Sequence, residues 1–65
     1  MIGEKDMYRN PDDIKQVILN EVAKDQIRIS KLSRHCYNEG TMWNVVRELK
    51  SKKLIDYDED FIWKA

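Results

Sequence analysis

The sequence predicts a small α+β domain in which helices precede a two-stranded β-hairpin. Residues 11–24 and 41–53 repeat apolar residues at helical spacing, and residues 54–64 place β-branched and aromatic residues around an acidic turn. The chain has 65 residues, of which 42% are hydrophobic, so its length fits one domain with one core. A domain this small buries only about 60% of the surface that its unfolded chain exposes, which leaves little room for a deep catalytic pocket.

The first predicted helix has a strong start signal. Residues 1–9 lack periodicity and are predicted to form a flexible N-terminal arm, followed by a single domain over residues 10–65. In Asn10-Pro11-Asp12-Asp13, Asn can cap, Pro suits the first turn, and the carboxylates favour the positive end of the helix dipole. We therefore expect a helix over 11–24, whose core-facing residues are Ile14, Val17, Ile18 and Val22.

A strand stub and a short helix are expected next. Ile27-Arg28-Ile29 alternates apolar and charged residues, but it is too short to be more than a stub. Ser30 is predicted to cap a helix over 31–37. Asn38-Glu39-Gly40 predicts a tight turn, because Asn and Gly tolerate left-handed backbone geometry.

The third predicted helix presents the outward-facing residues of most interest. Thr41 is predicted to cap it, and it should end near Lys52-Lys53, whose cations suit the negative end of the dipole. Its buried stripe is predicted to contain Met42, Val45, Val46 and Leu49. Its outward residues are predicted to be Trp43, Asn44, Arg47, Glu48, Lys50 and Ser51. Two interpretations of Trp43 stay open at this point, contact with a ligand and packing onto the core.

The last segment is predicted to be a one-sided hairpin. Its strands are residues 54–57 and 61–64, joined by the turn Asp58-Glu59-Asp60. Placing Tyr57 opposite Phe61 also places Ile55 opposite Trp63. These four side chains are then expected to face the helices, and the opposite face is expected to carry Asp56 and Ile62.

The composition argues against an enzyme, a metal site and a membrane protein. His35 and Cys36 are the only strong zinc ligands, and they are adjacent without a CxxC or HxxxH partner. Two glycines cannot build a phosphate-binding loop, and no catalytic constellation surrounds the single histidine, so no cofactor is expected. One cysteine allows no internal disulfide, and no apolar run approaches the roughly 20 residues of a membrane span. We therefore expect a cytoplasmic protein.

The charges are balanced in total but not along the chain. There are 12 Lys+Arg and 12 Asp+Glu, so the formal net charge is zero. Residues 27–55 nevertheless contain seven Lys or Arg and two Glu, for a net charge of +5. Residues 56–65 contain four acidic residues and one Lys. The basic middle segment is typical of a nucleic-acid footprint that a neutral total conceals.

The order of helix, strand stub, short helix, longer helix and two-stranded hairpin resembles the winged helix-turn-helix superfamily. The resemblance rests on the span Ile29–Cys36 and on Val45–Ile55, a third helix that ends in basic residues and a Leu-Ile entry to the wing. It covers Pro11–Ala65. It implies a small double-stranded-DNA-binding protein, a transcriptional regulator, that places helix 41–53 in the major groove.

The resemblance also implies a set of DNA-contacting residues. Asn can pair with adenine and Arg with guanine, whereas Lys and Arg on phosphates position the protein. The residues expected to read bases are Thr41, Trp43, Asn44 and Arg47. The residues expected to bind phosphates are Ser30, Lys31, Arg34, Lys50, Ser51 and Lys52. Since single modules of this size bind DNA weakly, we also expect a homodimer formed through helix 11–24 and the N-terminal arm.

The acidic wing tip departs from this pattern and supports an alternative. Asp58, Glu59 and Asp60 would be repelled by phosphates. The alternative is a winged-helix protein–protein interaction module that docks a partner through the acidic wing, an outward Ile62 and Trp43. A continuous basic face favours DNA, and interruption of that face by Glu39 and Glu48 favours a protein partner.

Overall fold

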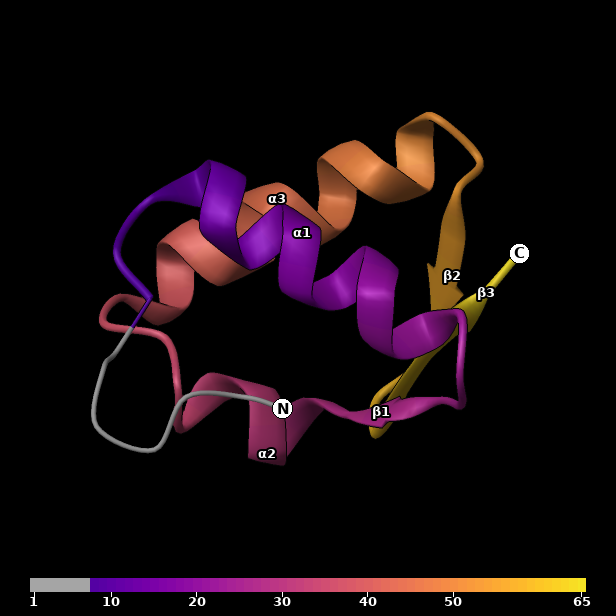
Figure 1. Cartoon of the computed structure of the whole chain (residues 1–65), viewed down its shortest axis with the longest axis horizontal. Coiled ribbons are helices and arrows are strands. Elements are labelled where there is room, and N and C mark those ends of the chain that lie inside the picture. The colour runs from indigo at the N-terminus through magenta and orange to yellow at the C-terminus, as the bar shows by residue number, and fades with distance from the viewer. Residues whose placement is uncertain (1–7) are drawn as a thin grey trace.

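The computed structural model describes residues 8–65, so the prediction of a flexible arm for residues 1–7 lies outside the described residues. The described part is an α+β fold with three helices and one three-stranded antiparallel sheet. Figure 1 shows α1 crossing in front of α3, with α2 below them and the sheet closing one end. The elements are α1 (Pro11–Val22), β1 (Ile27–Arg28), α2 (Ile29–Ser33), α3 (Glu39–Ser51), β2 (Ile55–Tyr57) and β3 (Phe61–Lys64).

Helix α1 begins as predicted and ends two residues early. The Oδ1 atom of Asn10 accepts a hydrogen bond from the Asp12 backbone N–H at 2.9 Å, which confirms the cap. The predicted end at Lys24 is wrong: the last residue of α1 is Val22, and the Lys24 N–H donates to the Glu21 carbonyl three residues back, a bond that tightens the turn after the helix. No apolar residue beyond Val22 continues the buried face.

Helix α2 occupies residues 29–33 rather than 31–37. Ile29 is its first residue, and Ser30 lies inside it, so the prediction of Ser30 as the cap is wrong. The chain leaves the helix because its next residues pair with Tyr8 in an isolated parallel bridge to Cys36. The Tyr8 N–H donates to the His35 carbonyl at 2.6 Å, and the Tyr37 N–H donates to the Tyr8 carbonyl at 2.9 Å. Tyr8, which the sequence placed in the arm, is thus attached to the domain.

Helix α3 starts two residues before its predicted cap. Asn38 caps it, with Oδ1 accepting from the Thr41 N–H at 3.2 Å, so the predicted turn over 38–40 and the Thr41 cap are wrong. A Cβ atom at Gly40 would lie 3.0 Å from that Oδ1 atom. Gly40 therefore leaves space for the cap instead of making a turn. After the helix, Lys53 has a φ of 62°, which turns the chain toward β2.

The sheet has the order β1-β3-β2, and its register corrects the predicted hairpin. Tyr57 pairs with Ile62, Asp56 with Trp63 and Ile55 with Lys64, one residue away from the prediction. A one-residue shift reverses every side chain in a strand. Ile62, predicted to face outward, is fully buried, and it also pairs with Ile27 across the sheet.

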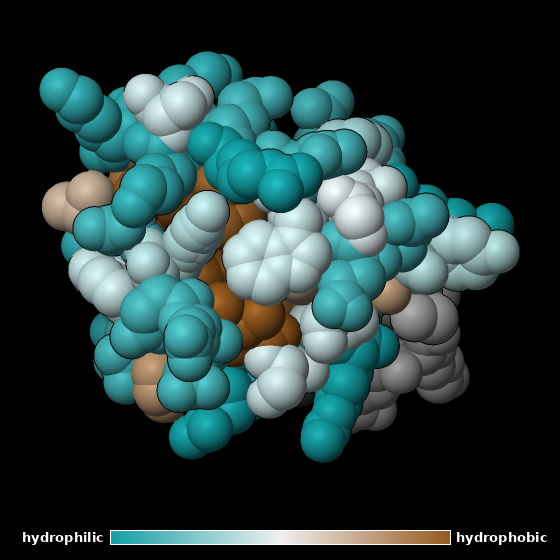
Figure 2. Space-filling model, turned by 180° about the vertical axis from the view of Figure 1, so that it is seen from behind, coloured by the Kyte–Doolittle hydropathy of each residue, from teal (hydrophilic) through white to brown (hydrophobic). Residues whose placement is uncertain are grey.

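The core joins one side of the sheet to α1 and α3. None of its members is polar among the described residues: they are Ile14, Ile18, Val22, Ile27, Ile29, Leu32, Cys36, Met42, Val45, Val46, Leu49, Ile55 and Ile62. Burial raises the pKa of the Cys36 thiol. Figure 2 shows the rear face, where brown hydrophobic side chains are visible mainly in a small central area surrounded by hydrophilic ones. No helix within residues 8–65 is long and apolar enough to cross a membrane.

Candidate nucleic-acid interface

The main exposed feature of α3 is a polar stripe opposite its buried face. At 100° per residue, Asn44, Arg47 and Ser51 lie on one side of the helix, and all three are exposed. The buried residues on the other side are Met42, Val45, Val46 and Leu49, as the sequence predicted. The same packing that anchors α3 therefore presents this stripe to solvent.

Asn44 and Arg47 act as a pair. The Nη2 atom of Arg47 donates a hydrogen bond to the Oδ1 atom of Asn44 at 2.9 Å. They are three residues apart, a spacing at which helical side chains are neighbours. The bond directs the guanidinium of Arg47 toward Asn44 on the exposed stripe.

Trp43 lies at the border between α3 and the hairpin. It is partly buried and packs against the core. Its ring meets Tyr57 of β2 edge-on, with the centroids 5.7 Å apart and the planes at 61°. Of the two interpretations that the sequence left open, this contact favours packing over base contact.

Lys50 forms an ion pair with a residue of β2. Its Nζ atom lies 2.7 Å from Oδ1 of Asp56 and 5.2 Å from the ring centroid of Tyr57. The hydrogen bond to Asp56 raises the pKa of Lys50. The same bond, with the Tyr57 backbone N–H, lowers the pKa of the Asp56 carboxyl. Lys50 thus connects the exposed helix to the hairpin.

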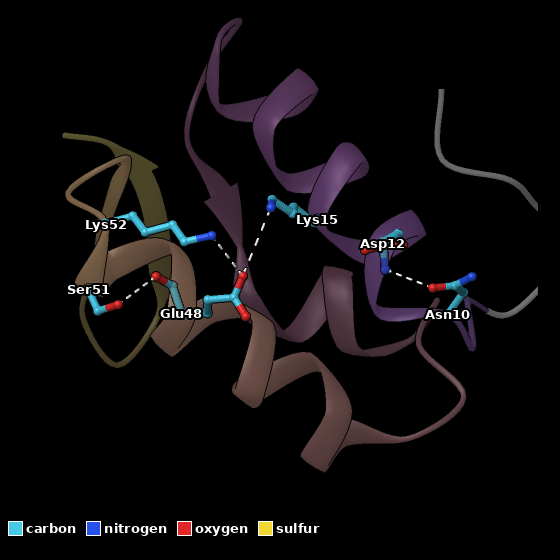
Figure 3. A network of polar contacts seen from close by, with 6 residues as sticks. All are labelled: Asn10, Asp12, Lys15, Glu48, Ser51 and Lys52. Atoms are coloured by element: carbon cyan, nitrogen blue, oxygen red, sulfur yellow. Dashed lines mark hydrogen bonds and ion pairs between the residues drawn. The ribbon is translucent and has the colours of Figure 1, made fainter.

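Glu48 forms ion pairs with two lysines at the border between α3 and α1 (Figure 3). Its Oε2 atom lies 3.2 Å from Nζ of Lys52 and 3.9 Å from Nζ of Lys15, which comes from α1. The hydroxyl of Ser51 donates to the Glu48 carbonyl at 2.9 Å. Glu48 therefore does interrupt the basic segment, but two lysines offset its charge. Sequence reasoning missed Lys15, which reaches this border only through the packing of α1 on α3.

The predicted phosphate-binding residues do not form one cluster. Ser30, Lys31 and Arg34 are exposed at α2, and the two cations have no ion-pair partner within residues 8–65. Figure 1 shows α2 and the C-terminal half of α3 at opposite sides of the fold. The structure therefore does not bring the α2 cations together with Lys50 and Lys52.

Asp58 stabilises the turn at the acidic tip of the hairpin, which contains Asp58, Glu59 and Asp60. Its Oδ1 atom accepts from the backbone N–H groups of Asp60 and Phe61, each at 2.8 Å. These two bonds lower the pKa of the Asp58 carboxyl. Next to the tip, the Arg28 guanidinium lies 4.9 Å from the ring centroid of Phe61, a contact that sequence reasoning did not identify.

The lowered pKa of Asp58 predicts a loss of stability in acid. A carboxyl with a lower pKa in the folded state stabilises the fold above its unfolded pKa, and that contribution disappears as pH falls through the folded value. We expect the urea midpoint to fall on acidification below about pH 4, the unfolded range of Asp. Asp58→Asn should flatten this fall, because the amide oxygen still accepts both bonds without titrating. Equal pH profiles for Asp58→Asn and the control Glu59→Gln would contradict this.

Comparison of the chain with models of protein families, with curated proteins and with solved structures found no match. Within residues 8–65 there is no group of three or more His, Cys, Asp or Glu side chains that could hold a metal ion. Its function is therefore inferred from the chain's own contacts. They define a small α+β domain that presents an exposed polar helix bordered by lysines.

Proposed function

We propose that this chain is a double-stranded-DNA-binding domain of the winged helix-turn-helix class, acting as a small transcriptional regulator. The observation that carries the proposal is the exposed stripe of α3, on which Arg47 donates a hydrogen bond to Asn44. The element order α1-β1-α2-α3-β2-β3 is compatible with the resemblance drawn from the sequence. In this proposal, α3 lies in the major groove and the hairpin is the wing.

The cations around the stripe support this placement. A B-DNA major groove is about 12 Å wide, and it admits one α-helix with phosphates on both sides. Lys50 lies on the hairpin side of the stripe, and Lys15 and Lys52 lie on the α1 side. A helix in the groove would therefore have a lysine near each phosphate backbone.

The ion pairs of these lysines do not exclude contact with phosphate. The side chains of Lys50 and Asp56 are 49% and 46% exposed, and those of Lys52 and Glu48 are 52% and 55% exposed. Ion pairs this exposed contribute little to stability, because both charges stay hydrated. A phosphate can therefore replace the carboxylate as the partner of each lysine at small cost.

Two observations bear on the alternative of a protein-docking hairpin in opposite directions. Glu48 interrupts the basic segment, which favours a protein partner, but the apolar patch that such a partner would contact is missing. That alternative used an apolar patch containing Ile62 and Trp43. Ile62 is fully buried, and Trp43 is packed against Tyr57. The acidic tip is exposed, but Ile62 and Trp43 do not form beside it the apolar centre that is typical of interface hot spots.

A homodimer on a two-fold DNA site remains part of the proposal. The expected dimer interface includes α1, where Val17 and Leu19 are partly buried and pack on the core of their own domain. The exposed residues of α1 include Asp12, Asp13, Gln16 and Asn20. A dimer formed through α1 would therefore rely on polar contacts.

Titration with random-sequence duplex DNA at several salt concentrations tests the proposal. Affinity should fall with salt, with a log–log slope of about −0.9 for each phosphate contacted. Arg47→Ala should weaken binding, whereas the matched control Lys24→Ala removes an exposed cation at the end of α1 and should not. Absence of binding at low salt would refute a DNA function and favour a protein partner.

A further inference from the structure

The polar groups on the exposed side of α3 are not equally available to a DNA base. Glu48 with Lys15 and Lys52, and Lys50 with Asp56, lie at the two borders of the stripe, where the proposal places the phosphates and not the bases. The hydroxyl of Ser51 is bonded to a backbone carbonyl of its own helix. Arg47 is exposed, and one of its N–H groups is used within residues 8–65. It therefore keeps the largest set of directed donors.

From this distribution of donors we infer that Asn44 and Arg47 form a single reader of guanine, in which Asn44 positions Arg47 and does not read a base of its own. The inference rests on the proposed DNA function and names the base that the site recognises. It replaces the expectation that Asn44 pairs with adenine independently.

The chemistry of the guanidinium supports this assignment. Guanine presents two acceptors, O6 and N7, in the major groove, and Arg can donate to both at once. The Nη2 atom carries two hydrogens, so it can donate one to Asn44 and the other to guanine while Nη1 donates to the second acceptor. The bond to Asn44 thus positions the guanidinium and still leaves one N–H group on Nη2 and those on Nη1 free to donate to guanine.

The same bond works against an adenine contact by Asn44. Bidentate pairing with adenine needs Oδ1 as an acceptor and Nδ2 as a donor, both aimed at the base. In the structure, Oδ1 is directed to Nη2 of Arg47. Pairing with adenine would require Asn44 to turn away and leave the guanidinium unsupported.

Selection from a randomised duplex library separates a coupled reader from two independent readers. The wild-type chain should enrich sites with an invariant guanine. Replacing that guanine with 7-deazaguanine, which lacks the N7 acceptor, should weaken wild-type binding about tenfold and leave Arg47→Ala unaffected. Asn44→Ala should reduce the preference at the same guanine and at no other position, and the double variant should match Arg47→Ala alone.

Matched controls make each outcome decisive. Gln26→Ala removes an exposed side-chain amide from the loop between α1 and β1 and should leave the selected site unchanged. If Asn44→Ala relaxes an adenine position and keeps the guanine, the coupled reader is refuted while DNA binding stands. Enriched sites without an invariant guanine would also refute it. If no duplex binds at low salt, the DNA function itself fails, a result that the titration reports separately.

Discussion

Ile62→Ala should lower the free energy of unfolding by about 2–5 kcal/mol, the usual cost of removing a buried Ile side chain. Ile62 is fully buried in the central strand, and it pairs with Ile27 on one side and Tyr57 on the other. At about 0.05–0.15 kcal/mol per residue, a domain of this length has roughly 3–10 kcal/mol in total. The variant should therefore lose a large part of its stability, and its urea midpoint should fall strongly.

Urea denaturation followed by circular dichroism measures this effect. Phe61→Ala is the matched control, because Phe61 lies next to Ile62 but faces the other side of the sheet and is only partly buried. If Ile62→Ala does not fold, Ile62→Val should still cost about 0.5–1.5 kcal/mol. A larger loss for Phe61→Ala than for Ile62→Ala would show that the hairpin has the register expected from the sequence.

The hairpin also shows why its register could not be read from the sequence. Phe61, Ile62 and Trp63 are consecutive and all apolar, so a two-residue period does not distinguish the two faces. The geometry of the turn determines which of the two registers forms. Asp58 accepts two backbone N–H groups at the tip, and this geometry sets Tyr57 opposite Ile62.

The helices were more predictable than their ends. The buried faces of α1 and α3 follow directly from their apolar spacing, and the start of α1 follows from Asn10 and Pro11. Near α3, Asn38 and Thr41 are both ordinary capping residues. Only the structure shows that the chain before Asn38 pairs with Tyr8, so that the helix starts at Glu39.

The candidate site was predictable as a helix face but not as a set of contacts. Helical spacing places Asn44 and Arg47 on the exposed side of α3, and three-residue spacing allows their bond. The partners of the lysines depend on tertiary structure. Lys15 reaches Glu48 from another helix, and Asp56 reaches Lys50 from a strand.

Reversing the charge of the wing tip should strengthen DNA binding if the wing lies beside the duplex. Glu59→Lys with Asp60→Lys replaces two exposed carboxylates with ammonium groups, while Asp58 keeps its turn-stabilising bonds. With the tip about 10 Å from phosphates, this change of four charge units should raise affinity about tenfold at low salt. Fluorescence titration with random duplex DNA measures the change.

A second double variant separates a local contact from the effect of net charge. Glu21→Lys with Asp25→Lys changes the total charge by the same four units near the C-terminal end of α1, where added cations suit the helix dipole. Because charges are screened over about 10 Å at 0.1 M salt, the advantage of the tip variant should shrink as salt rises. Equal gains for both double variants would mean that the wing tip stays clear of the duplex, so that recognition would depend on α3 without the wing.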